Sequence, residues 1–306
     1  MLKIRIITDS SSGFTKEEIL KHNIHVLPLT LSYDNKDYLD GVDISTDDFY
    51  KMFFDNQQKR GLAKLDILGL FKKDEKDFPK TSMVKPQDFV NEYNKIIEEG
   101  YLPVVLCISR RLSGTYQSAI MAKDLIENDD IVVIDSQTAL GSVKVLIKSV
   151  LQKEYENRDE LINEIESLKK RINFYAVPET LAYLAKGGRL GKFSAKVGNL
   201  LHFKPIIQLD EEGILTPIDK PRGLKQAFRE VNNCLKENPI DFDYPCEFGY
   251  STKIENVNQL IESCKESLKG NYTTCQISPV VGAHVGPGAS ALFYVSKNEV
   301  NKKLLK

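Results

Sequence analysis

In the first half of the chain, short continuous apolar runs alternate with segments whose apolar residues recur every third or fourth position. Runs at 2–8, 102–108 and 131–134 predict strands that are buried on both faces. Apolar residues from Phe89 to Ile97 at helical spacing predict an amphipathic helix, and another is expected from Ser113. Buried strands that alternate with helices are typical of a parallel sheet covered by helices. We therefore expect an N-terminal Rossmann-like sheet.

Local signals mark further elements of this region. Thr15 and Glu18 form a capping-box pattern, which predicts the start of a short helix, and Ser45 begins a second helix signal. The segment 24–31 predicts a strand. Residues 56–76 are polar and Lys-rich around a small apolar patch, so we expect a surface insertion there.

The second half mixes the two patterns. Helices predicted at 141–155 and 159–171 each carry a strongly charged face, and the second is expected to bridge to another domain. The turn 210–213 predicts a hairpin. Further strands are expected at 174–177, 205–209, 214–218, 247–250, 273–277 and 291–295, and helices at 223–237 and 255–268. We expect an α/β fold of two domains, a parallel one over 1–165 and a mixed one over 166–306.

The composition is that of an ordinary globular protein of 306 residues, 42% hydrophobic and 28% charged. Lys and Arg number 42 and Asp and Glu 43, a balance that argues against generic binding to nucleic acid or to an anionic membrane. No apolar run reaches the length of a membrane span, so we expect a cytoplasmic protein without stable membrane insertion. The five cysteines lack Cys-x-x-Cys spacing and are interpreted as reduced packing residues.

Hydroxyl side chains gather where three of the predicted N-terminal strands end. The turns span 9–12, 109–115 and 135–138, and Thr81 and Ser82 add two more hydroxyls. The carboxyl ends of parallel strands line the ligand crevice of an open sheet, so these groups are expected at one rim. Such a rim of neutral donors is suited to hold one carboxylate or phosphate without chemistry.

The turn Ser113-Gly114-Thr115 is the leading candidate within this rim. The first turn of a helix has N–H groups without intrahelical partners and carries the positive end of the helix dipole, so an anion is stabilised there. Gly114 would let the backbone approach the anion, and Ser113 and Thr115 would add hydroxyl donors. The alternative is that Ser113 only caps the helix, a role that serine favours.

Few other side chains suggest a role in ligand, metal or partner binding. His284 lies in a glycine-rich segment that predicts a turn between strands, as an anion contact or as a structural imidazole. Asp9 and Asp135 suit turn formation and capping, with ligation of Mg²⁺ as the alternative. Arg189 and Arg222 lie in basic neighbourhoods, where the alternatives are solvated charge and docking of a partner.

Together these motifs resemble the DegV family of bacterial lipid-binding proteins, which includes the fatty-acid-binding subunit of the bacterial fatty acid kinase. The resemblance covers nearly the whole chain, in the family's order. It depends on Ile7-Thr8-Asp9-Ser10, Lys80-Thr81-Ser82, Leu112 to Ala119, Val133-Ile134-Asp135-Ser136, Thr180 to Leu184 with Lys186-Gly187-Gly188-Arg189, Lys204-Pro205-Ile206-Ile207, and Gly282-Ala283-His284 with Gly286-Pro287-Gly288-Ala289.

The resemblance implies a protein that binds one long-chain fatty acid, such as palmitate, stearate or oleate, and has no cofactor. It also implies that the chain is not an enzyme, because a separate ATP-dependent fatty acid kinase would phosphorylate the carboxylate for phospholipid synthesis. By position, Thr81 and Ser113 would hydrogen-bond the carboxylate, with His284 close by. Arg189 and Arg222 would face the kinase. The ligand-binding candidates are Thr81, Ser82, Ser113, Gly114, Thr115 and His284.

Candidates for contact with the tail are apolar residues of the second half, and plain core packing is their alternative role. They are Phe174 to Val177, Leu181, Leu184, Val197, Leu200, Leu201, Phe203 and Ile206. The chain departs from the family pattern at Met83-Val84-Lys85, beside the expected head group, at Arg110-Arg111, and in the length of the 56–78 insertion.

Two other functions stay open on the sequence alone. One is a Mg²⁺-dependent enzyme that acts on a small phosphorylated or carboxylated substrate through Asp9 or Asp135, although general bases are scarce. The other is a scaffold without a ligand, which predicts a pocket filled by side chains.

Overall fold

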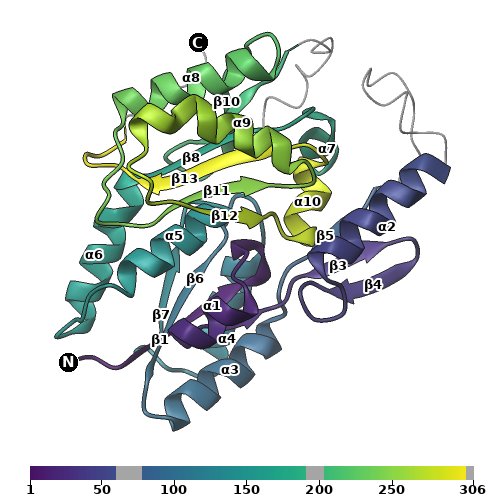
Figure 1. Cartoon of the computed structure of the whole chain (residues 1–306). Coiled ribbons are helices and arrows are strands. Elements are labelled where there is room, and N and C mark those ends of the chain that lie inside the picture. Colours follow the sequence, from purple (N-terminus) through teal and green to yellow (C-terminus); the bar gives the residue numbers. More distant parts are fainter. Residues whose placement is uncertain (60–77, 191–202, 301–306) are drawn as a thin grey trace.

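The computed structural model describes residues 1–59, 78–190 and 203–300, and its first sheet has four parallel strands (Figure 1). In spatial order they are β2 (His25–Leu27), β1 (Ile4–Asp9), β6 (Leu102–Cys107) and β7 (Val132–Asp135). Two helices pack against each other and against β6 and β7, namely α3 (Pro86–Glu98) and α4 (Thr115–Leu125). The predicted Rossmann-like N-terminal sheet is confirmed.

The second sheet has six strands and is mixed, as predicted for the C-terminal half. In order they are β10 (Leu215–Asp219), β9 (Ile206–Leu209), β8 (Ile172–Val177), β13 (Ser290–Val295), β11 (Cys246–Tyr250) and β12 (Thr273–Gln276). Only the β11–β12 pair within this sheet is parallel. One face is covered by α8 (Leu224–Glu237) and α9 (Ile254–Cys264), and the other faces the N-terminal half (Figure 1).

A small antiparallel sheet, with the order β4 (Lys36–Leu39), β3 (Thr30–Tyr33) and β5 (Lys80–Ser82), lies at the edge of the N-terminal half. The prediction of one strand over 24–31 is therefore wrong. The chain leaves the parallel sheet after Leu27 and starts β3 at Thr30, with Pro28 between them. Proline has no N–H for a strand ladder, which accounts for the break there.

The helix α5 (Gly141–Val150) lies between the two larger sheets, where it contacts β6 on one side and β8, β11 and β13 on the other. The predicted helix end at residue 155 is wrong, because α5 ends at Val150. Almost every residue of α5 is buried, including Lys144, whose Nζ lies 3.0 Å from Glu247 and 3.1 Å from Glu18. These carboxylates compensate the buried charge of Lys144.

The other helices follow the predicted signals more closely. Thr15 and Glu18 form the capping box of the first helix, and the Ser45 hydroxyl accepts from the Asp48 N–H at 3.1 Å. The remaining helices are η1 (Ser10–Ser12), α1 (Lys16–His22), α2 (Thr46–Lys59), α6 (Arg158–Arg171), α7 (Ala182–Lys186), η5 (Lys265–Ser267) and α10 (Pro279–Val285). None of the helices in the described part of the chain is long and apolar enough to cross a bilayer.

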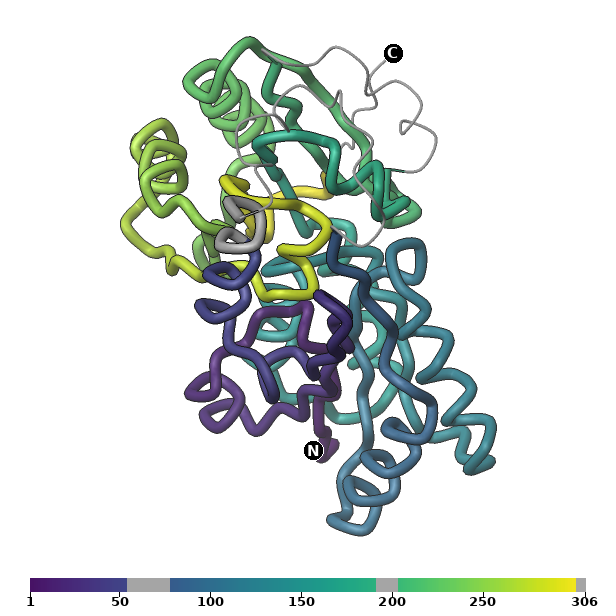
Figure 2. Tube along the Cα trace, turned by 90° about the vertical axis from the view of Figure 1, so that its right-hand side faces the viewer, coloured from purple at the N-terminus to yellow at the C-terminus, as the bar shows by residue number. Residues whose placement is uncertain are grey.

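The two halves of the chain occupy different regions of the molecule. In Figure 2 the purple and blue segments of the N-terminal half lie mainly below the green and yellow segments of the C-terminal half. The boundary between residues 165 and 166 stays a prediction, since α5 contacts both sheets and α6 leads directly into β8. The predicted insertion at 56–78 lies mostly outside the described residues.

Candidate functional site

A cavity of about 200 Å³ lies between the two halves. This is more than ten times the roughly 15 Å³ that one buried water needs. Most of its wall is apolar, with contributions from Leu112 and Leu140 of the N-terminal half and Leu184, Ile207 and Leu215 of the C-terminal half. Its polar side chains are Ser11, Thr81, Ser82, Ser113, Arg189, His284 and Ser290. The cavity therefore suits a long apolar ligand with one polar end.

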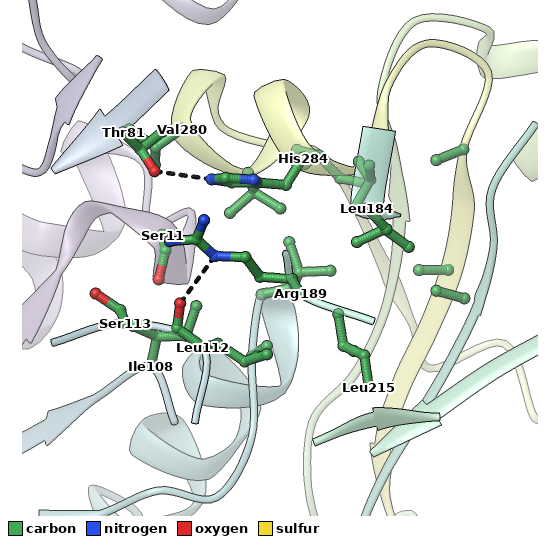
Figure 3. Close-up of a pocket in the computed structure, with 18 of the residues that line it drawn as sticks. Ser11, Thr81, Ile108, Leu112, Ser113, Leu184, Arg189, Leu215, Val280 and His284 are labelled. Carbon is green, nitrogen blue, oxygen red and sulfur yellow. Dashed lines mark hydrogen bonds between the residues drawn. The ribbon is translucent and has the colours of Figure 1, made fainter. Parts of the chain in front are cut away.

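Thr81 and His284 form the central polar contact of the cavity. Thr81 lies on β5 and His284 on α10, and Thr81 Oγ1 is 2.7 Å from His284 Nε2 (Figure 3). Burial, with a smaller effect of the Arg189 charge, lowers the pKa of His284 to about 4. The imidazole is therefore neutral at physiological pH, with one nitrogen as donor and the other as acceptor.

The prediction that His284 lies in a turn between strands is wrong, because the residue is in the last turn of α10. Proline at the first helical position suits this short helix, since its missing N–H would have no partner there. The backbone of Gly187 packs against the other side of the ring, because a Cβ at Gly187 would collide with His284 Nδ1. The imidazole is thus fixed between β5 and the end of α7.

Arg189 lies inside the cavity wall, directly after α7. Its Nε donates to the Leu112 carbonyl at 3.2 Å (Figure 3), and its Nη1 donates to the Gly187 carbonyl. Burial lowers the pKa of the guanidinium, which nevertheless stays charged at neutral pH. The predicted role of Arg189 in partner binding stays a prediction, and its position beside His284 also supplies a positive charge to the polar end of the cavity.

The Ser113 turn connects β6 to α4, but its local geometry differs from the prediction. The helix α4 begins at Thr115, its N-cap is Gly114, and no side chain caps it. Ser113 lines the cavity, and its Oγ lies 2.9 Å from Thr115 Oγ1 and accepts from the Thr115 N–H at 3.3 Å. Thr115 is fully buried behind it, outside the described cavity wall. The interpretation of Ser113 as the N-cap is therefore wrong.

Gly114 and Ser82 also line the cavity. A Cβ at Gly114 would collide with the Met83 Sδ, so the close approach that this glycine allows is to the Met83 side chain. Met83 is 49% exposed and forms part of the wall, which confirms that this departure from the family pattern lies at the cavity.

The carboxylates at the strand ends organise the loops of this corner. Asp9 is fully buried and accepts from the Ser11 N–H at 3.0 Å and the Ile108 N–H at 2.8 Å. Asp135 accepts from the backbone N–H groups of Arg110 and Gln137 at 3.2 and 3.1 Å. The expected structural roles are thus confirmed, since Asp9 caps η1 and Asp135 forms a turn, and Asp9 positions Ser11 in the cavity wall.

Comparison with known proteins identifies the family. A family model described as "Uncharacterised protein, DegV family" matches residues 3–297. The chain belongs to the DegV family. A DegV domain-containing protein of Clostridium acetobutylicum is 33% identical over 302 residues, which cover 97% of this chain and all of the relative. Another, from Caldanaerobacter subterraneus, is 30% identical over 301 residues with the same coverage.

Solved DegV structures share the whole architecture. A fatty-acid-binding DegV family protein from Thermus thermophilus superimposes with a TM-score of 0.82 at 25% identity, over 96% of this chain and all of the other. A fatty-acid-binding DegV protein from Streptococcus agalactiae gives 0.81 at 25%, over 97% and 100%. A stearic-acid-binding protein from Eubacterium ventriosum gives 0.79 at 26%, over 97% and 99%.

In this DegV protein, three of the eight expected tail contacts that lie in described residues line the cavity. Along β8, Phe174 and Ala176 do so, whereas Tyr175 and Val177 pack in a second core with α8 and α9. Successive side chains of a strand point to opposite faces, and all four residues are apolar or aromatic, so the pattern alone does not indicate which pair faces the cavity. By the same alternation, Ile207 and not Ile206 lines the cavity.

Leu184 lines the cavity as predicted, while Leu181 and Phe203 lie outside its described wall. Val197, Leu200 and Leu201 lie outside the described residues. Arg222 is exposed, and its guanidinium lies 5.8 Å from the centre of the Phe203 ring. The Arg222 side chain is thus a solvent-accessible charge on the surface.

Proposed function

We propose that this DegV protein binds one long-chain fatty acid, with the hydrocarbon tail in the cavity and the carboxylate at the polar end. The observation that carries the proposal is one apolar cavity with a polar end formed by Thr81, Ser113, Arg189 and His284. A tail of some fifteen methylenes, at about 0.8 kcal/mol each, contributes on the order of 12 kcal/mol before ordering costs. The tail therefore supplies the affinity.

The polar end has the groups that a buried carboxylate needs. A carboxylate is costly to bury unless it is hydrogen-bonded and its charge is compensated. The hydroxyls of Thr81 and Ser113 are donors, the imidazole of His284 is neutral, and Arg189 is the adjacent cation. The head group is thus oriented by hydroxyl groups and neutralised in part by Arg189.

The solved relatives support this class of ligand. Structures that match this chain over nearly its full length, from Thermus thermophilus and Streptococcus agalactiae, are of fatty-acid-binding proteins, and the Eubacterium ventriosum protein binds stearic acid. Palmitate, stearate and oleate are accordingly the ligands to test first.

The protein's further role is to present the carboxylate to a separate ATP-dependent fatty acid kinase, in the cytoplasm, for acyl-phosphate formation and phospholipid synthesis. The chemistry of the cavity supports a carrier: its polar end consists of hydroxyls, a neutral imidazole and a guanidinium, and Asp9 is engaged in loop hydrogen bonds. Arg222, exposed on the surface, and Arg189 are the candidates for contact with the kinase.

Lipid analysis of the purified protein tests the binding role. Native mass spectrometry and organic extraction are expected to show one long-chain fatty acid per chain, and the delipidated protein is expected to rebind palmitate, stearate or oleate. Thr81→Val and Ser113→Ala remove donors to a charged group, so each should weaken binding by roughly ten- to a hundredfold. Thr274→Val, on the exposed edge strand β12, is the control. A protein that carries no such acid and binds none of the three contradicts the proposal.

The presentation role needs its own assay. With a fatty acid kinase and ATP, acyl phosphate should form on the loaded protein, and Arg222→Ala should lower the rate while fatty acid affinity stays unchanged. Normal rates with this variant would exclude Arg222 from the kinase contact.

A further inference from the structure

Two residue pairs on the adjacent strands β8 and β13 lie at the cavity, and three of the four residues, Phe174, Ala176 and Ala291, line it. In the antiparallel pairing of β8 with β13, Ala176 lies opposite Ala291 and Phe174 lies opposite Phe293. All four side chains belong to the core on the cavity side of the sheet. A pair of alanines is therefore followed along the strands by a pair of phenylalanines.

The two pairs fill space very differently. Ala176 and Ala291 both line the cavity, and their short side chains leave the hollow above them open. The rings of Phe174 and Phe293 pack with their centres 5.6 Å apart. Phe293 in turn lies directly on the backbone of α5, because a Cβ at Gly141 would collide with its ring. Phe174 is thus backed by a ring that has little room to move.

The strand β8 leads along the cavity from the side of α7 and His284 toward Phe174. Phe174, Ala176 and Pro178 line the cavity in succession, and the four steps from residue 174 to residue 178 span about 13 Å at roughly 3.3 Å each. After Pro178 the chain enters α7, whose C-cap Gly187 contacts His284. The direction from Pro178 to Phe174 therefore leads away from His284.

A second, much smaller void lies on the other side of Phe174. Its volume is about 10 Å³, close to the roughly 10–15 Å³ minimum for one water. Its wall is formed by Gln137, Thr138, Lys169, Ile172, Phe174, Gln208 and Leu209. Within the described part of the chain, Phe174 is the residue that both walls share. The Phe174 ring is the partition between the two spaces.

We propose that Phe174 terminates the tail cavity and so sets the longest fatty acid that the protein accepts. This inference rests on the proposed binding of a fatty acid. Each methylene that is buried raises affinity by about fourfold. Affinity should rise with chain length until the tail meets the Phe174 ring, and then fall because the ring is held by Phe293.

The test is competition among saturated fatty acids of 12 to 22 carbons for the delipidated protein, with bound acids identified by mass spectrometry. Phe174→Ala joins the two spaces and should move the preferred length upward by about two carbons, with roughly tenfold tighter binding of acids just beyond the wild-type optimum. Ala176→Leu fills part of the cavity and should therefore shift the preferred chain length downward. Leu292→Ala, equally buried on the opposite face of β13, is the control and should leave the preferred length unchanged.

Phe174→Leu is the milder variant and should give a smaller upward shift, which keeps the test decisive where Phe174→Ala does not fold. Folded Phe174 variants with the wild-type preferred length would overturn the assignment while leaving fatty acid binding intact. Wild-type protein that binds none of these acids would instead overturn the proposed function and this inference together.

Discussion

Thr81 and His284 are separated by 203 residues in the chain, yet Thr81 Oγ1 lies 2.7 Å from His284 Nε2. The contact joins a strand of the N-terminal half to a helix of the C-terminal half. Because the imidazole is neutral, the hydroxyl and the ring can exchange donor and acceptor roles. The Thr81 hydroxyl and the His284 imidazole can therefore both donate to a carboxylate that binds between this pair and Ser113.

Gly187→Ala is expected to weaken fatty acid binding with little loss of stability. Gly187 has an ordinary helical backbone, with φ of −69°, so alanine causes no backbone strain there. Its methyl group would nevertheless displace His284, whose Nδ1 occupies that space. Binding should fall roughly tenfold, on the scale of one lost hydrogen bond to a charged group, in titrations of the delipidated protein.

The neighbouring glycine provides the matched control for this variant. Gly188 has a φ of +72° and open space where a Cβ would lie. Gly188→Ala should therefore lower the free energy of unfolding by about 1 kcal/mol through strain and leave fatty acid affinity intact. Equal effects of the two variants on binding would contradict the role assigned to the His284 position.

The pKa of His284 predicts a loss of stability in mild acid. It falls from 6.5 to about 4 through burial and the Arg189 charge, so the folded state resists protonation that the unfolded state accepts. Stability from this group is complete above pH 6.5 and is lost as the pH falls toward 4, by up to about 3 kcal/mol. Urea unfolding between pH 7 and pH 4 should show a smaller loss in His284→Gln, and NMR should show a neutral His284 ring at pH 6. A ring that is half-protonated near pH 6.5 would refute this.

The parts of the fold that the sequence could predict are those with a pattern of their own. Continuous apolar runs predicted the parallel strands, and strand ends rich in hydroxyls predicted the corner with Ser11 and Ser113, to which Thr81 of β5 adds a further hydroxyl. The strand β8 is buried along its whole length, so no polar residue indicated which of its faces meets the cavity. The burial of Lys144 depends on Glu18 and Glu247, which lie 126 and 103 residues away in sequence, and no local pattern contains them.

The buried carboxyl group of Asp40 should make the protein less stable at alkaline pH than the variant Asp40→Asn. Asp40 is 3% exposed, and burial, aided by the Asp9 charge, raises its pKa from 3.8 to about 7. The protonated form therefore stabilises the fold at pH below 3.8, and this contribution is lost as the pH rises to 7. Asp40→Asn stays neutral, so at pH 8 it should be more stable than the wild type by up to about 4 kcal/mol.

Chemical denaturation at pH 5 and pH 8 checks this prediction, since the advantage of Asp40→Asn should shrink at the lower pH. The exposed Asp129 gives the control, because Asp129→Asn should change stability little at either pH. An advantage of Asp40→Asn that is independent of pH would argue against titration of this carboxyl.

Lys144 and Lys148 of α5 form an ion cluster with Glu18 and Glu247. The effects of substitutions in this cluster on the free energy of unfolding should not add. Lys144 and Glu247 are each 1% exposed, so Lys144→Met leaves a buried carboxylate whose nearest remaining cation is Lys148, at 3.3 Å. Removal of one partner of a buried pair costs about 3–5 kcal/mol, and the lower end applies here because Lys148 remains. In the double variant Lys144→Met/Glu247→Leu most of that loss should be recovered, since apolar side chains then occupy the positions of both buried charges and Glu18 keeps Lys148 at 2.6 Å.

Urea unfolding of the single and double variants measures this coupling. The pair of the exposed Lys153 with the partly buried Glu164 is the comparison, and Lys153→Met should cost less than about 1 kcal/mol. If the double variant is less stable than Lys144→Met, the two charges act independently and α5 is held by its apolar contacts alone. A recovery would show instead that Lys144 is tolerated between the sheets because Glu247 and Glu18 reach it from both halves of the chain.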